Sequence, residues 1–95
     1  MSEIPEIWPK NIKAAVNQLL IELPIEQKNK IVSYSEEELI NLHFGMGTYI
    51  RNEFGLWHGN KDLLRECGKE DMHPDDASMV IIKALWKMLK EKEKK

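Results

Sequence analysis

The stretch "SEEELINLHFGMGTYIRNEFGLW", residues 35–57, decides how this chain is expected to fold. Ser35 followed three residues later by Glu38 is the pattern of a capping box, which marks the start of a helix. Gly55 is a natural end, because glycine readily adopts the left-handed conformation that follows a helix. We therefore predict one continuous central helix over residues 35–54.

Apolar residues on either side of this stretch also recur with the period of a helix. Upstream they are Ile12, Ala15, Val16, Leu19, Leu20 and Leu23, which share one face. We expect Pro9 to be the first residue of that helix, where its missing N–H costs nothing, and Pro24 to end it. A short second helix is predicted at about residues 25–32.

Two further helices are predicted downstream. Asn60 is a suitable cap for a short helix over residues 61–67. "HPDDAS" opens the last helix, with Asp75 and Asp76 in its first turn, where carboxylates favour the positive end of the helix dipole. Strand-type alternation is absent from the sequence. The predicted fold class is all-α: a compact single-domain bundle of three main helices plus two short ones.

Length and composition limit the classes of protein that fit. The 95 residues suit one domain, predicted as residues 1–95 with an N-terminal arm (1–8) and a frayed charged tail (91–95). The net charge of −2 disfavours nucleic-acid binding. The single cysteine, Cys67, fits a reducing cytosol, and neither a signal peptide nor a membrane span is recognised. We expect a cytoplasmic protein.

Arg51 and Asn52 are the most conspicuous residues of the central stretch, since they interrupt an apolar segment. A buried cation needs a partner, and Asp75 and Asp76 have the right sign. One interpretation is that Arg51 and Asn52 lock onto the start of the last helix, over residues 75–78. The other is that Arg51 faces a cleft and binds a carboxylate or a phosphate.

The neighbouring residues carry the same two kinds of interpretation. His43 is either a hydrogen-bonded core residue or a ligand or base that shares a polar seam with Arg51. Gly45 and Gly47 either let a large ring or another helix approach closely, or interrupt the helix and offer N–H groups to an anion. We favour close packing for the glycines, and we expect Trp57 to cap the core.

Metal and catalytic motifs are weak. His43, His58, His73 and Cys67 have none of the spacings typical of metal ligands, so neither a metal nor a cofactor is predicted. Arg51 and His58 do match the Arg-x₄₋₆-His element of the helical HEPN ribonucleases, in which Arg stabilises an anion and His moves a proton.

The sequence also resembles a small bacterial family catalogued as a domain of unknown function. The resemblance covers about residues 12–89 and rests on "LHFG" with Gly47, then "IRN", "GLW" and "HPDD" with Ser78. It implies a compact helical domain without an established activity, and it does not require a histidine at position 58. The residues that it marks as defining are His43, Arg51, Asn52, Trp57, Asp75, Asp76 and Ser78.

The sequence therefore favours a non-catalytic protein-interaction or regulatory module with a protein partner. The alternative is an anion- or phosphodiester-binding domain, or a HEPN-like ribonuclease, that uses Arg51 with His58 or His43. The oligomeric state is left open between a monomer and a weak homodimer formed through Met79 and Trp86.

Overall fold

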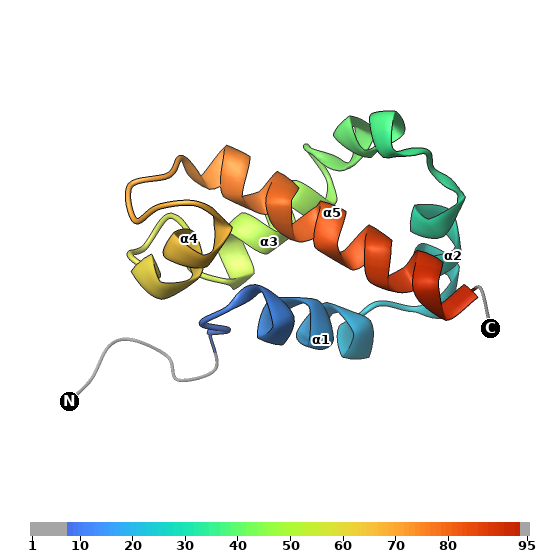
Figure 1. Ribbon diagram of the computed structural model, residues 1–95, viewed down its shortest axis with the longest axis horizontal. Coiled ribbons are helices and arrows are strands. Elements are labelled where there is room, and N and C mark those ends of the chain that lie inside the picture. Colours follow the sequence, from blue (N-terminus) through green and yellow to red (C-terminus); the bar gives the residue numbers. More distant parts are fainter. Residues whose placement is uncertain (1–7, 94–95) are drawn as a thin grey trace.

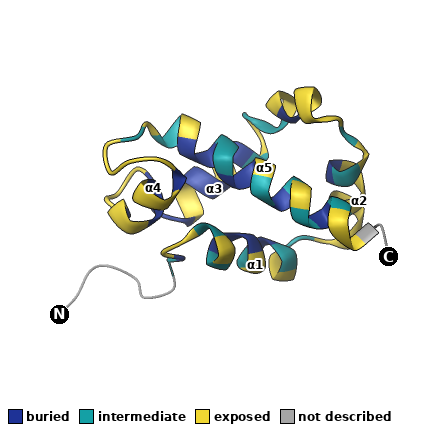
Figure 2. Ribbon diagram, viewed as in Figure 1, coloured by how far each residue is buried: buried dark blue, intermediate teal, exposed yellow. Residues whose placement is uncertain are grey.

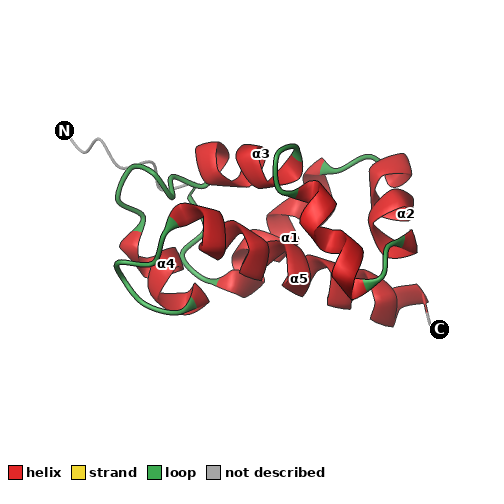
Figure 3. Ribbon diagram, turned by 90° about the horizontal axis from the view of Figure 1, so that it is seen from above, coloured by secondary structure: helices red, strands yellow, loops and turns green. Residues whose placement is uncertain are grey.

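The computed structural model describes residues 8–93, and within them the chain is helical without any strand (Figure 1). The elements are α1 (Ile12–Glu22), α2 (Ile25–Ser33), η1 (Glu36–Leu42), α3 (Met46–Glu53), α4 (Lys61–Cys67) and α5 (Pro74–Glu93). Short loops join them (Figure 3). The all-α class is confirmed. Most of the predicted arm, residues 1–7, and residues 94–95 of the predicted tail lie outside the described residues.

The long helix α5 is the element around which the others are arranged. It contacts α1, α2, α3, α4 and η1. In Figure 1 it runs along the length of the molecule, with α1 on one side and η1 on the other. Its buried residues follow the helical period and form a dark stripe in Figure 2: Ala77, Ser78, Ile81, Ile82, Leu85 and Leu89. Amphipathic helices packed on one apolar stripe therefore make a single core.

The central helix differs from its prediction, because it is divided into two elements. η1 is a 3₁₀-helix, whose last bond runs from the N–H of His43 to the carbonyl of Ile40 at 3.0 Å. A turn over residues 43–45 follows, with Gly45 at φ −89° and ψ −84°, outside the helical range. The predicted count of three main and two short helices therefore does not match. The start was correct: the Ser35 N–H donates to Glu38 Oε1 at 2.8 Å.

Capping side chains set the starts of the other helices. α1 begins after Asn11, whose Oδ1 accepts the N–H of Ala14 at 2.7 Å, so the prediction of Pro9 as the first helical residue was wrong. An asparagine cap satisfies a free helix N–H, which proline at that point would not do. Asn60 caps α4 as predicted, through Oδ1 and the N–H of Leu63.

Asn60 also holds distant parts of the chain together. Its Nδ2 donates to the carbonyls of Pro9 and Phe54, at 2.9 and 2.7 Å. Gly55, which follows Phe54, has φ +70°, and a side chain there would overlap the ring of Trp8. The N-terminal end of the described chain is therefore fixed against the turn that follows α3.

Candidate functional site

Arg51, in the last turn of α3, lies at the centre of the polar residues that the sequence singles out. Only 6% of it is exposed. Its Nη1 donates to Ser78 Oγ at 3.0 Å, and its Nη2 donates to Thr48 Oγ1 at 2.9 Å and to the His43 carbonyl at 3.3 Å. Its Nε lies 3.3 Å from Asp75 Oδ1. All three nitrogens of the guanidinium therefore have partners within the chain, as the scaffold interpretation predicts for Asp75 and Ser78.

Ser78 links the arginine to the start of α5. The Ser78 hydroxyl is fully buried; it accepts from Arg51 and donates to the Asp75 carbonyl at 2.9 Å. Because both its donor and acceptor functions are used internally, this hydroxyl serves the packing of α3 against α5. We call Arg51, Thr48, Asp75, Ser78 and the His43 carbonyl the Arg51 cluster.

Two histidine rings flank the half-exposed carboxylate of Asp75. His43 Nε2 lies 3.9 Å from Asp75 Oδ2, which is too long for a hydrogen bond. His73 Nδ1 lies 3.8 Å from the same oxygen, but it accepts the Asp75 N–H at 3.0 Å. A ring nitrogen that accepts an N–H carries no proton, so its lone pair is already used as a helix cap.

The His43 side chain does not form the predicted hydrogen bonds. Its Nδ1 is buried without a hydrogen-bond partner in the described part of the chain. Its ring meets the ring of Phe44 edge to face, with centroids 4.9 Å apart. His43 takes part in the Arg51 cluster through its backbone carbonyl, a role that residue identity does not reveal.

The two glycines turn out to have different roles. A Cβ added to Gly47 would lie 2.9 Å from Arg51 Nη1 and 3.6 Å from Ser78 Oγ, so close packing is confirmed there. A Cβ added to Gly45 would meet no atom within 4 Å beyond the adjacent residues, so the close-packing prediction was wrong for it. Gly45 instead sits in the turn that separates η1 from α3.

Three of the predicted site residues lie outside the Arg51 cluster. Asn52 and Asp76 are exposed. Within residues 8–92, Asn52 does not bond to the start of α5, and Asp76 does not pair with Arg51. Trp57 is 49% exposed and meets the ring of His73 edge to face, so the prediction that it caps the core was wrong. The turn after α3 places Trp8, not Trp57, against Gly55.

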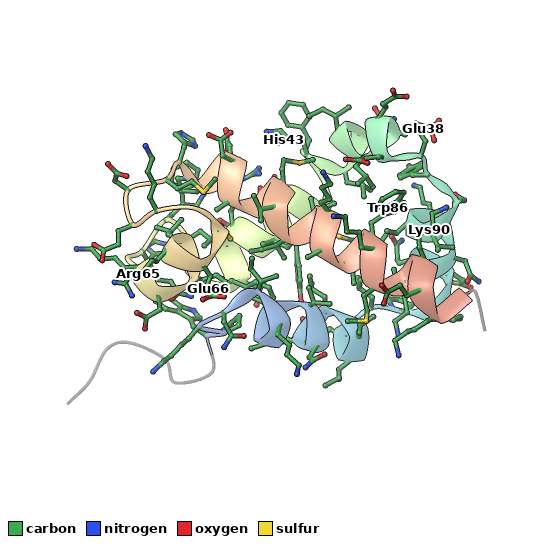
Figure 4. All side chains as sticks on the ribbon, in the orientation of Figure 1. Glu38, His43, Arg65, Glu66, Trp86 and Lys90 are labelled. Carbon is green, nitrogen blue, oxygen red and sulfur yellow. The ribbon has the colours of Figure 1, made fainter. Side chains whose placement is uncertain are left out.

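Trp86 has an internal role as well. Its Nε1 donates to the Tyr34 carbonyl at 2.8 Å, and the Lys90 Nζ lies 5.5 Å from its ring centroid (Figure 4). The half-buried ring therefore ties α5 to the connection between α2 and η1. Sequence reasoning also missed Thr48, whose position one helical turn before Arg51 was the available signal.

Large apolar side chains are exposed beside the Arg51 cluster, and no pattern in the sequence predicts their exposure. Phe44 is 85% exposed and Ile40 is 60% exposed. Ile40 belongs to η1, whose surface is mostly exposed in Figure 2, and Phe44 follows in the turn before α3. The turn itself is fixed, because the Thr48 hydroxyl donates to the Phe44 carbonyl at 2.7 Å and Arg51 binds the carbonyl of His43.

Elsewhere on the surface, an ion pair and a hydrogen bond between side chains connect the helices. Lys83 of α5 lies 2.6 Å from Glu36 of η1, and this hydrogen-bonded lysine lowers the pKa of the Glu36 carboxyl. The Tyr49 hydroxyl of α3 donates to Glu22 of α1. That bond, followed by partial burial and the nearby negative charge, raises the pKa of Tyr49 to about 12.

Residues 8–92 do not bring three histidine, cysteine or acidic side chains together in a group that could hold a metal ion. His58 is exposed in the turn between α3 and α4, and in the described chain its side chain does not bond to Arg51. None of the helices described in residues 8–93 has the length and apolarity needed to cross a bilayer.

Of three comparisons with known proteins, only the comparison with protein families finds a match. Neither the curated proteins nor the solved structures provide a match to this chain. A family match covers residues 8–89, from the tryptophan that packs on Gly55 to the last buried leucine of α5. The chain therefore belongs to the family described as "Domain of unknown function (DUF6794)".

Proposed function

We propose that this protein is a non-catalytic protein-interaction module that binds a protein partner through the surface around Phe44 and Ile40. The observation that carries this proposal is the exposure of Phe44, 85%, on a turn that internal hydrogen bonds hold in place, and of Ile40, 60%, on the adjoining η1. Exposed apolar groups on a fixed backbone are typical of binding surfaces, since little conformational entropy is lost when they are covered.

The state of Arg51 supports binding over catalysis. An anion site or a ribonuclease site needs a guanidinium that can reach the substrate, whereas each nitrogen of Arg51 is engaged within the chain. The Ser78 hydroxyl is buried, and hydrogen bonds within the chain use both its acceptor and its donor function. Arg51, which every form of the alternative function requires, therefore already stabilises the contact between α3 and α5.

The test compares partners captured by the wild-type protein and by the double variant Ile40→Ser/Phe44→Ser. Ile21→Ser is the matched control, because Ile21 is 83% exposed on α1, on the other side of α5 (Figure 1). We expect one protein whose recovery falls at least about tenfold with the double variant and is unchanged with the control. The recovered protein must then bind the purified wild-type chain directly.

Two results would contradict the proposal. One is a set of captured proteins that does not change when Ile40 and Phe44 are replaced. The other is a ribonuclease activity of the purified protein that is lost in both Arg51→Lys and His58→Ala, which would favour the phosphodiester alternative.

A further inference from the structure

A groove between η1 and α5 lies beside the exposed apolar residues. Its volume is about 320 Å³ and its lining residues are Glu36, Glu37, Leu39, Ile40, Met79, Val80 and Lys83. Leu39, Ile40, Met79 and Val80 provide an apolar floor, of which Leu39 is buried and Ile40 is exposed. We call this the η1–α5 groove. A partner that places apolar side chains in this groove would remove its apolar floor, including the exposed Ile40, from water.

The rim of the η1–α5 groove is predominantly acidic. Glu36, Glu37 and Glu38 form the first turn of η1. Asp76 lies three and four residues before Met79 and Val80, and so shares their face of α5. Lys83 is the cation on this rim, and it is paired with Glu36.

The charges on the rim are therefore not balanced internally. Among residues 8–92, neither Glu37 nor Asp76 has a cationic side chain within ion-pair distance. One carboxylate oxygen of Glu38, Oε1, accepts the N–H of Ser35. Glu37 of η1 lines the groove, and Asp76 lies one helical turn before Met79 and Val80 on α5, so each element brings a carboxylate near the apolar floor.

We propose that the η1–α5 groove binds a basic amphipathic helix of the protein partner. The apolar face of such a helix enters between Ile40 and Met79, and its lysine or arginine flanks meet Glu37 on one side and Asp76 on the other. The proposal rests on the proposed function and specifies the chemistry of the partner. Charge complementarity selects this occupant, because an acidic helix would place carboxylates against carboxylates.

Two synthetic peptides test the charge requirement. Both carry leucines at the spacing of one helix face; one has lysines at the flanking positions and the other has glutamates. Binding of each fluorescently labelled peptide to the full-length protein is measured by anisotropy at low and high salt. We expect the lysine peptide to bind at least about tenfold more tightly than the glutamate peptide, with an affinity that falls as salt is added.

Protein variants locate the binding site. Glu37→Gln/Asp76→Asn removes two carboxylates from the rim and should weaken the lysine peptide by about tenfold. The matched control, Glu53→Gln/Glu66→Gln, removes two exposed carboxylates from α3 and α4; Figure 4 shows Glu66 on the opposite side of the molecule from Glu38. The control should bind like the wild type, and Ile40→Ser/Phe44→Ser should lose binding.

Several outcomes would overturn the inference. These are failure of the lysine peptide to bind, equal binding of the glutamate peptide, or an equal loss in the control variant. Concentration-dependent self-association that Ile40→Ser abolishes would assign the groove to a second copy of this chain. If a captured partner depends on Phe44 but is insensitive to Glu37→Gln/Asp76→Asn, the proposed function stands and only the basic character of the partner is wrong.

Discussion

At the scale of single residues, Arg51 shows why an arginine occurs inside an apolar segment. Its planar group reaches a hydroxyl of α5, a hydroxyl of its own helix, a carbonyl of the preceding turn and a carboxylate at the start of α5. No other side chain presents several N–H groups in this fixed arrangement. The segment therefore requires arginine for its geometry as much as for its charge.

Arg51→Lys should lower the free energy of unfolding by about 2–3 kcal/mol, because one ammonium cannot satisfy all the partners that lose an N–H. Urea unfolding followed by circular dichroism measures the change. Arg65→Lys is the matched control: Arg65 is 56% exposed and its acidic partners are also exposed, so its cost should be far smaller than that of Arg51→Lys. Equal stability of Arg51→Lys and the wild type would contradict the assigned role.

The glycines give a second prediction at this scale. Gly47→Ala places a Cβ 2.9 Å from Arg51 Nη1, so it should destabilise the protein although alanine is the better helix former. Gly45→Ala meets no atom within 4 Å. The difference between the two variants should be about 1–2 kcal/mol in thermal or urea unfolding, with Gly47→Ala the less stable. The reverse order would refute the close-packing role of Gly47.

At the scale of the elements, α1 and α5 were predictable from their apolar stripes and α4 from its Asn60 cap, although the first residue of α1 was not. The predicted helix at about residues 25–32 corresponds to α2, which is polar and has one buried residue, Ile31. The lock between Arg51 and Asp75 was predictable from charge and burial. The split between η1 and α3 was the less favoured of two interpretations of the glycines, because apolar spacing continues through the turn while backbone angles at Gly45 change. Because Phe44 lies in the turn between η1 and α3, its exposure was not predicted either.

Trp86 provides a test of how one element holds another. Trp86→Phe keeps an aromatic ring but removes the N–H that donates to the Tyr34 carbonyl, and should cost about 1 kcal/mol. Hydrogen exchange should rise mainly in α2 and in the connection to η1, while α4 keeps its protection. A uniform change along the chain would show that the bond does not act locally.

The bond between Tyr49 and Glu22 links α3 to α1 and makes stability depend on alkaline pH. The folded state raises the pKa of Tyr49 from 10.0 to about 12, so the stabilisation is complete below pH 10 and is lost as the pH rises towards 12. Tyr49→Phe should therefore lose less stability than the wild type across this window in urea unfolding. Tyr34→Phe, the control, should behave like the wild type; equal loss in Tyr49→Phe would disprove the link.

At the scale of the whole molecule, one core holds all the helices together through α5. Buried residues from α1, α2, η1, α3 and α4 join the stripe of α5 in one cluster, with Phe54 among the largest fully buried side chains. A small domain with a single core is expected to unfold as one unit. Global unfolding should therefore be cooperative, while local openings of lower free energy still differ between the elements.

Cys67 tests this cooperativity, since it is buried at the end of α4. Burial, with a smaller effect of Glu66, raises the pKa of its thiol to about 11 from 9.0. At neutral pH the reactive thiolate should be roughly 100-fold scarcer than in the unfolded chain. Alkylation should therefore follow global unfolding across a urea series; fast labelling of the folded protein would indicate that α4 opens by itself.

The separation between the Arg51 cluster and the exposed side chains that it supports has an evolutionary consequence. Arg51 holds the turn by its backbone carbonyl, so the identity of the neighbouring side chain at position 44 is irrelevant to the grip. Mutations at positions 40 and 44 should then change the stability of the fold little, because both side chains are exposed. Under the proposed function, substitutions there would change which partner binds while the residues that hold the fold stay the same.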